Sequence, residues 1–98
     1  MSETVEQLLA RLRAEYLAEA PAKLAEIENA VSNYEPANQE SAVRLARLLH
    51  RLAGSAGAYG FKEVTKLCRE AEESLGREPR PTRETMAGVV VAVRETLA

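Results

Sequence analysis

The sequence predicts an all-α protein: an antiparallel, up-down four-helix bundle with a short N-terminal helix packed on it. Apolar residues recur at three- and four-residue spacing along nearly the whole chain, without strand-like alternation. Proline, glycine and asparagine cluster at a few points, where they divide the chain into helices joined by short connections. Short connections place successive helices antiparallel, so residues 1–98 are expected to form one domain.

The first two helices are expected on either side of Pro21. A short helix is predicted from Glu3 to Tyr16. Its apolar face consists of Val5, Leu8, Leu9 and Leu12. A second helix is predicted to begin just before Pro21, because proline is tolerated in the first turn of a helix. The apolar residues of this second helix are Leu24, Ile27 and Val31.

The remaining helices are separated by two loop-forming segments. Residues 33–41, NYEPANQES, end the second helix and cap the third, which is expected to stop near Gly57 to Gly60. Residues 76–82, GREPRPT, precede the last helix, and Thr82 is its predicted cap. The apolar residues are Val43, Leu45, Leu48, Leu49, Leu52 and Ala56 in the third helix, Phe61, Val64, Leu67, Cys68, Ala71 and Leu75 in the fourth, and Met86, Val89, Val90 and Val93 in the last.

Composition and charge argue against several classes of function. A formal net charge of -2 provides no basic field to attract nucleic acid or an anionic membrane. The N-terminus, MSETVEQLLARLRAE, lacks the basic segment and apolar core of a secretion signal, and the longest apolar run, MAGVVVAV, is too short to span a bilayer. A single cysteine excludes an internal disulfide and is typical of a reducing compartment. A cytoplasmic protein is therefore expected, and it is expected to be monomeric.

The third helix places the only histidine of the chain outside its apolar stripe. On a helical wheel of about 100° per residue, His50 lies about 140° from Leu45, which marks the core-facing direction. Its neighbours on the wheel are the small residues Ala46, Ala53, Gly54 and Gly57. His50 is therefore expected on an exposed flank among residues with almost no side chain, with Arg47 just beyond.

Two interpretations of the glycines are open on the residues alone. A lone histidine on a helix surface is usually just solvated, and glycines near a helix end are usually caps, as Gly57 and Gly60 could be. Gly54 lies inside the apolar repeat, where glycine costs roughly 1 kcal/mol. Because Gly54 lies about 180° from Leu45, close packing against the core does not explain it, whereas clearing space for a docking partner does.

An exposed imidazole in such a clearing can carry a phosphoryl group, because the neutral ring is a good nucleophile near pH 7. The sequence lacks the residues that hydrolysis, zinc binding or ATP binding would need. There is no second histidine for hydrolysis, one His and one Cys cannot build an ordinary zinc site, and no Walker-type loop indicates ATP binding. Cys68 lies on the core stripe of the fourth helix, where it is expected to be buried packing rather than a nucleophile.

The stretch LLHRLAGSAGAYGF, residues 48–61, resembles the signature of the histidine-containing phosphotransfer (Hpt) domain, the relay module of two-component signalling. The family motif has a histidine, two variable residues, a lysine, a glycine, two small residues, and a glycine ten positions after the histidine. The matching residues are His50, Gly54, Ser55, Ala56 and Gly60, with Phe61 following as an apolar residue. Ala53 stands where the motif has lysine, which removes the cation usually near the phosphoryl group.

The resemblance implies that His50 is phosphorylated at its outer nitrogen and exchanges phosphate with a receiver-domain aspartate, without kinase activity of its own. The implied partners are a response-regulator receiver domain and a histidine or hybrid kinase. Magnesium would belong to the receiver, so no cofactor is expected on this chain. Glu72, 22 positions after His50, matches a place where kinase-linked members keep a glutamate that hydrogen-bonds the inner imidazole nitrogen. Gly54, Ser55 and Gly57 are the small residues expected beside His50 at the surface where the receiver docks.

An arginine of the third helix is expected to replace the missing lysine in part. Arg47 lies about 60° from His50 on the wheel and Arg51 about 100°, so Arg47 is favoured. Two other functions stay open: a helical adaptor that keeps the bundle but only binds a partner, and the phosphoacceptor domain of a larger chemotaxis-type kinase.

Overall fold

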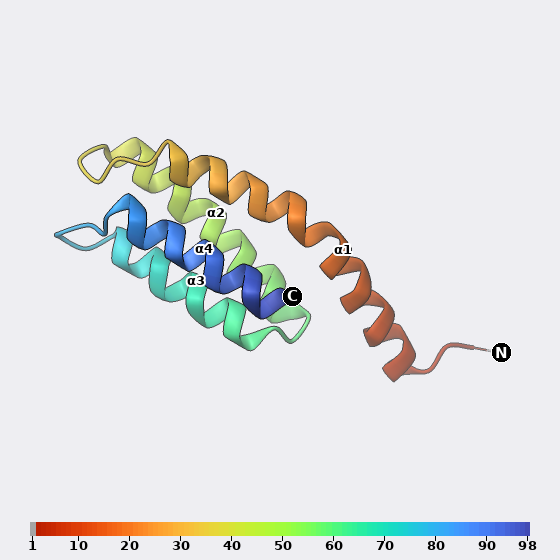
Figure 1. Ribbon diagram of the computed structural model, residues 1–98. Coiled ribbons are helices and arrows are strands. Elements are labelled where there is room, and N and C mark those ends of the chain that lie inside the picture. Colours follow the sequence, from red (N-terminus) through yellow and green to blue (C-terminus); the bar gives the residue numbers. More distant parts are fainter. Residues whose placement is uncertain (1) are drawn as a thin grey trace.

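The computed structural model describes residues 2–98, and within that range it contains four α-helices and no strand. The helices are α1 (Val5–Ser32), α2 (Gln39–Ala58), α3 (Lys62–Leu75) and α4 (Arg83–Leu97). They run alternately up and down as a bundle (Figure 1), so the predicted all-α class and bundle architecture are confirmed.

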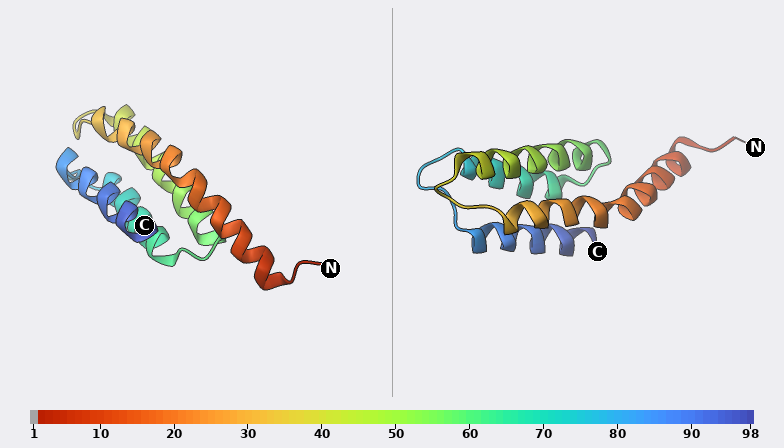
Figure 2. Two further views of the ribbon diagram at one scale, coloured as in Figure 1. Left: turned by 45° about the vertical axis from the view of Figure 1, so that its right-hand side comes forward. Right: turned by 90° about the horizontal axis from the view of Figure 1, so that it is seen from above.

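The helices follow one another around the bundle. Helix α1 packs on α2 and α4, and α3 packs on the same two helices from the other side (Figure 2). The α2–α3 pair forms the most extensive contact, and its connection, residues 59–61, is the shortest of the three. A short connection brings consecutive helices together as antiparallel neighbours, and this pair supports the functional site described below.

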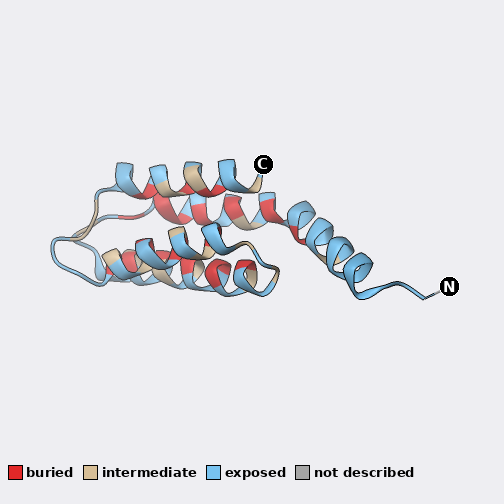
Figure 3. Ribbon diagram, turned by 90° about the horizontal axis from the view of Figure 1, so that it is seen from below, coloured by how far each residue is buried: buried red, intermediate tan, exposed pale blue. Residues whose placement is uncertain are grey.

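Most of the core comes from the apolar faces that the helical periodicity predicts, although Val43 of α2, expected on such a face, is 39% exposed. Within the described part of the chain, no polar or charged side chain is counted among the buried residues. Members of the core that were expected from the sequence include Leu24, Ile27, Val31, Leu45, Leu49, Leu52, Ala56, Val64, Cys68, Ala71, Leu75, Met86, Val90 and Val93. Buried positions from the four helices meet along the centre of the bundle (Figure 3).

Three helix N-termini carry side-chain caps. Thr4 and Gln7 form a reciprocal capping box at the start of α1, with hydrogen bonds of 2.9 and 3.1 Å. The Asn38 side chain accepts from the Ser41 amide at 2.8 Å, and Thr82 caps α4, which confirms the cap predicted there. Each cap satisfies backbone N–H groups that have no partner inside the helix.

The prediction of two helices on either side of Pro21 is wrong, because α1 runs without interruption from Val5 to Ser32. Proline lacks an N–H, so the Leu17 carbonyl loses its partner in the helix. Both Leu17 and Pro21 are exposed, so this carbonyl lies on a part of the helix that water reaches. The helix bends away from the bundle in its N-terminal half (Figure 2), as expected for a proline kink.

The N-terminal half of α1 also does not pack on the bundle in the way predicted for a short first helix. Its apolar residues remain largely in solvent, with Val5 73% and Leu9 48% exposed. This segment projects past the other helices (Figures 1 and 3) and accounts for much of the 57 Å length of the molecule. The bundle therefore consists of α2, α3, α4 and the part of α1 that follows Arg13.

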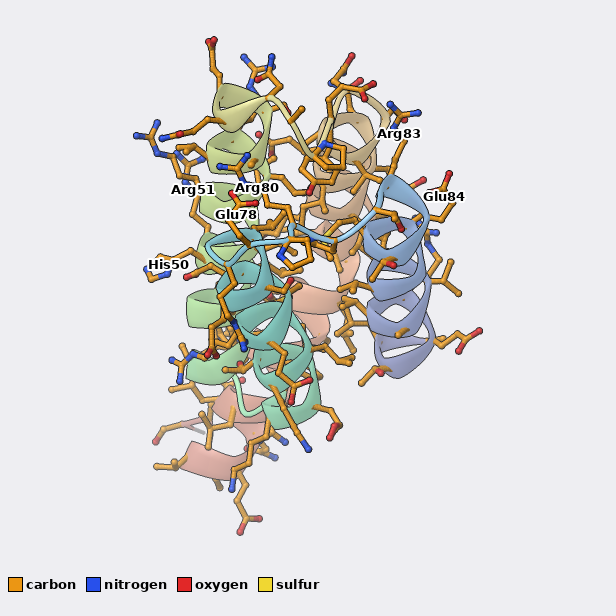
Figure 4. All side chains as sticks on the ribbon, turned by 90° about the vertical axis from the view of Figure 1, so that its left-hand side faces the viewer. His50, Arg51, Glu78, Arg80, Arg83 and Glu84 are labelled. Carbon is orange, nitrogen blue, oxygen red and sulfur yellow. The ribbon has the colours of Figure 1, made fainter. Side chains whose placement is uncertain are left out.

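Two loops meet at the opposite end of the bundle and are tied together through hydrogen bonds to backbone carbonyls. The Tyr34 hydroxyl donates to the Pro81 carbonyl at 2.7 Å, and the Arg80 guanidinium donates to the Pro36 carbonyl at 2.8 Å. Arg83 donates to the Tyr34 carbonyl at 3.1 Å. Arg80 and Arg83 both lie at this end of the bundle (Figure 4). These bonds fix the α1–α2 connection against the α3–α4 connection, and so help to hold the helices that carry the site.

Candidate functional site

His50 lies in the second half of α2 and points away from the core. Its side chain is 78% exposed, whereas Leu45, Leu49 and Leu52 of the same helix are buried. The ring projects outward from the bundle surface (Figure 4). The exposed position expected from the helical wheel is therefore the observed one.

Glu72 of α3 lies directly beside the imidazole. Both carboxylate oxygens of Glu72, Oε1 and Oε2, are 2.9 Å from Nδ1 of His50. The glutamate is more sheltered than the histidine, with 29% of its side chain exposed. Antiparallel packing of α2 on α3 brings together two residues that are 22 positions apart in the chain.

This contact orients the ring and selects its tautomer. A carboxylate only accepts hydrogen bonds, so Nδ1 carries the proton and donates it toward Glu72. In the neutral ring, Nε2 then has the free electron pair, and the exposure of the side chain leaves this nitrogen open to solvent. A carboxylate at Nδ1 also stabilises the positive charge that the ring acquires when Nε2 forms a new bond.

Gly54 and Gly57 lie near His50 on α2, but their surroundings differ. A Cβ atom at Gly54 would have no atom of another element within 4 Å, so this side of the histidine is open space, as expected from the sequence. A Cβ atom at Gly57 would be 3.1 Å from the hydroxyl oxygen of Thr65 on α3. Gly54 therefore leaves the surface beside His50 clear, while Gly57 permits the close approach of α3.

The expectation that Ala53 lies on the exposed flank is wrong. Ala53 is 2% exposed, because α3 packs over that part of α2. The Thr65 hydroxyl of α3 donates to the Ala53 carbonyl at 2.8 Å, a second contact that sets the spacing of the two helices. Sequence reasoning did not find Thr65, since no local pattern around an isolated threonine in a helix indicates what faces it.

Arg47 and Arg51 both lie on the α1 side of α2 rather than on the α3 side. They line a groove of about 730 Å³ between α1 and α2, together with Glu26 and Asn29 of α1. Within residues 2–98, no hydrogen bond or ion pair joins either arginine to His50. The imidazole is held toward α3 by Glu72, so the structure separates it from the two arginines that the wheel placed near it.

Ser55 faces α1 and belongs to a group of contacts at the base of the site. Its hydroxyl lies 2.9 Å from the hydroxyl of Tyr16, a buried residue of α1. The Tyr16 ring packs against Tyr59 and Phe61, with ring centroids 5.0 and 5.5 Å away. Burial raises the pKa of Tyr16 above its ordinary value. These contacts give Ser55 a packing role between α1 and α2.

Gly60 closes the motif with a backbone conformation that suits glycine. Its φ of +85° lies in the left-handed region, and a Cβ there would be 2.7 Å from an Arg13 guanidinium nitrogen. The Arg13 Nε donates to the Tyr59 carbonyl at 2.8 Å. Arg13 and Tyr16 of α1 therefore brace the turn that follows the histidine helix, a contribution that the sequence did not reveal.

Cys68 is fully buried in α3, as its place on the core stripe predicted. Burial, with a smaller effect of the nearby Glu72 charge, raises the pKa of its thiol to about 11. A thiol with this pKa stays protonated near pH 7 and is a poor nucleophile. The chemistry of this surface therefore rests on His50.

Comparison with known proteins bears on the same residues. The family model of the Hpt domain matches residues 11–98, nearly the whole chain, and this range includes His50 and Glu72. The chain belongs to the Hpt domain family. Hpt domains are phosphocarriers of two-component signalling and interact with receiver domains and histidine kinases, so a phosphotransfer role follows for this chain. No curated protein and no solved structure gave a significant match.

The motif position of lysine is occupied by Ala53, and the backbone there is covered by α3. No helix in the described range, residues 2–98, is long and apolar enough to cross a membrane.

Proposed function

We propose that this Hpt domain relays a phosphoryl group between receiver-domain aspartates, or accepts it from a histidine kinase, through Nε2 of His50. The observation that carries the proposal is the pairing of a 78% exposed imidazole with a carboxylate 2.9 Å from Nδ1. This pairing leaves one ring nitrogen nucleophilic and exposed, and it compensates the charge that forms on the ring.

The transfer uses the free electron pair of Nε2. This pair attacks the phosphorus of an aspartyl phosphate on the receiver, and a nitrogen–phosphorus bond forms as the bond from phosphorus to the aspartate oxygen breaks. The electron pair of the broken bond returns to the aspartate carboxylate. The Nδ1 proton stays on the ring, where Glu72 accepts its hydrogen bond and balances the positive charge of the phosphorylated ring.

The partner is expected to dock over the second half of α2 and over α3. The open space at Gly54 lets the receiver approach the imidazole closely. Magnesium, if the receiver binds it, belongs to the receiver and not to this chain. We also propose that residues 1–98 act as one domain, as a cytoplasmic monomer with no cofactor of its own.

The alternative of a pure adaptor is less well supported. An adaptor needs an exposed surface but not a carboxylate that fixes the tautomer of its only histidine. The further alternative, that the chain is the phosphoacceptor domain of a larger kinase, assigns the same chemistry to His50. The length of the natural gene separates it from a free-standing carrier.

The experiment is a transfer assay with candidate receivers that have been phosphorylated with acetyl phosphate. Label is expected to appear on the protein within seconds to minutes, and it is expected to be labile in acid. The variant His50→Gln should keep the helical circular dichroism of the wild type and accept no label. Label on His50→Gln would contradict the assignment, and tight receiver binding without any label on the wild type would support the adaptor.

A further inference from the structure

A phosphoryl group on His50 would bring about two negative charges to the surface between α2 and α3. The two arginines nearest to it on α2, Arg47 and Arg51, face the groove on the α1 side. Ala53, which stands in place of the motif lysine, has no charge. A cation that meets the phosphoryl group is therefore expected from α3, the helix whose Glu72 contacts the ring.

The register of α2 against α3 shows which α3 residue lies nearest. His50 faces Glu72, and Gly57 faces Thr65, so seven residues forward on α2 correspond to seven residues back on α3. By the same register, three residues forward from His50 and three residues back from Glu72 bring Ala53 level with Arg69. Arg69 thus lies across from the position where the family motif has its lysine.

Arg69 also lies on the correct side of α3. On a helical wheel it is about 60° from Glu72 and about 40° from Thr65, the two residues that face α2. Cys68, on the other side of Glu72, is buried, so Arg69 lies on the solvent side, where His50 also projects. The neighbouring cation Lys66 is about 120° from Glu72 and faces further away from α2.

The Arg69 side chain is free to move into this space. It is exposed, and in the part of the chain that the structure describes it takes part in none of the ion pairs. The rise along the helix between the levels of Glu72 and Arg69 is about 4.5 Å. Helical side chains lean toward the N-terminus of their helix, so Arg69 has to turn back by this one rise to reach His50, which the length of an arginine side chain permits. Gly54 presents no side chain between Arg69 and the ring.

We propose that Arg69 binds the phosphoryl oxygens of phosphorylated His50 and so supplies from α3 the cation that position 53 lacks. The inference rests on the proposed function of His50. Guanidinium donates paired, charge-assisted hydrogen bonds to phosphoryl oxygens, and solvent exposure reduces their strength. Arg69 takes the place that the sequence assigned to Arg47.

The test uses phosphoramidate, a small donor that phosphorylates histidine without a partner protein. Arg69→Ala should slow formation of phosphohistidine about three- to fivefold and should move its ³¹P resonance. Arg69→Lys should recover most of the rate, because it returns a cation to the same position. The matched control is Lys66→Ala, which removes an exposed cation of the same helix and should react like the wild type.

The ring of the unphosphorylated protein provides a second readout. If Arg69 acts on the phosphoryl group, Arg69→Ala leaves the ¹⁵N chemical shifts of the free His50 ring unchanged; altered shifts would mean that it acts through Glu72 and would overturn the proposal. The role of Arg69 would also be overturned if Arg69→Ala kept the wild-type rate and ³¹P shift, or if Lys66→Ala lost as much of the rate as Arg69→Ala. Either result would leave His50 as the phosphoacceptor. Failure of the wild type to form any phosphohistidine would overturn both proposals.

Discussion

Replacing Glu72 with alanine tests the central contact of the site. The change removes both oxygens that lie 2.9 Å from Nδ1 and leaves the backbone of α3 in place. A charge-assisted hydrogen bond contributes about 1.5–3 kcal/mol where water is excluded. Because the imidazole is 78% exposed, a value of about 0.5–1 kcal/mol applies here, which corresponds to a two- to fivefold slower transfer.

The assay is quenched-flow transfer from a phosphorylated receiver, together with ¹⁵N spectra of the ring. Glu72→Ala should transfer two to five times more slowly and should show a larger share of the tautomer with the proton on Nε2. Glu73→Ala is the matched control, because it removes a neighbouring carboxylate that pairs with Arg77 instead of His50. If Glu72→Ala kept both the wild-type rate and the wild-type tautomer, the orienting role of Glu72 would be refuted.

Three further predictions concern residues around the site. Gly54→Ala should raise the free energy of unfolding by about 0.5–1 kcal/mol in urea titrations, because a Cβ there meets nothing within 4 Å. Gly54→Gln should slow phosphoryl transfer with an unchanged or higher Tm, because its long side chain fills the space beside His50. Equal transfer rates for Gly54→Gln and the wild type would remove the docking argument. Gly60→Ala should cost about 1–2 kcal/mol, because φ is +85° there and a Cβ would disturb the Arg13 bond to the Tyr59 carbonyl; unchanged stability would contradict this. Burial raises the pKa of Cys68 from 9.0 to about 11, so between pH 9 and 11 the native thiol keeps its proton while the unfolded thiol loses it. The free energy of unfolding should therefore fall by about 1–3 kcal/mol over that window, and Cys68→Ala should remove this part of the pH dependence. An identical pH profile for Cys68→Ala and the wild type would refute this prediction.

Local sequence patterns determined the parts of the fold whose causes are local. The apolar stripe of α2 predicted its buried face, and Thr82 predicted the start of α4, because periodicity and capping act within one or two turns of a helix. The stripe of α2 also predicted that His50 is exposed, and the stripe of α3 predicted that Cys68 is buried. The family motif around His50 is likewise contiguous in the chain, so the type of chemistry could be recognised before the fold was known.

Pro21 shows where local rules failed. A proline was expected to separate two helices, yet it removes only one hydrogen bond, and buried residues on both sides, Tyr16 and Leu24, pack into the same core. Packing of Tyr16 and Leu24 into the core on the two sides of Pro21 offsets the loss of one exposed bond, and the helix bends instead of ending. The balance between these two effects depends on tertiary contacts that the sequence does not display.

The surroundings of His50 were decided by tertiary structure alone. The helical wheel of α2 gives directions relative to its own axis, but exposure depends on which helix occupies each direction. Helix α3 covers Ala53 and brings Glu72 to the imidazole, while Arg47 lines the groove beside α1. His50 and Glu72, 22 positions apart, meet because α2 and α3 are antiparallel in one particular register. That register is fixed by packing and by the Thr65 bond to the Ala53 carbonyl rather than by either helix alone.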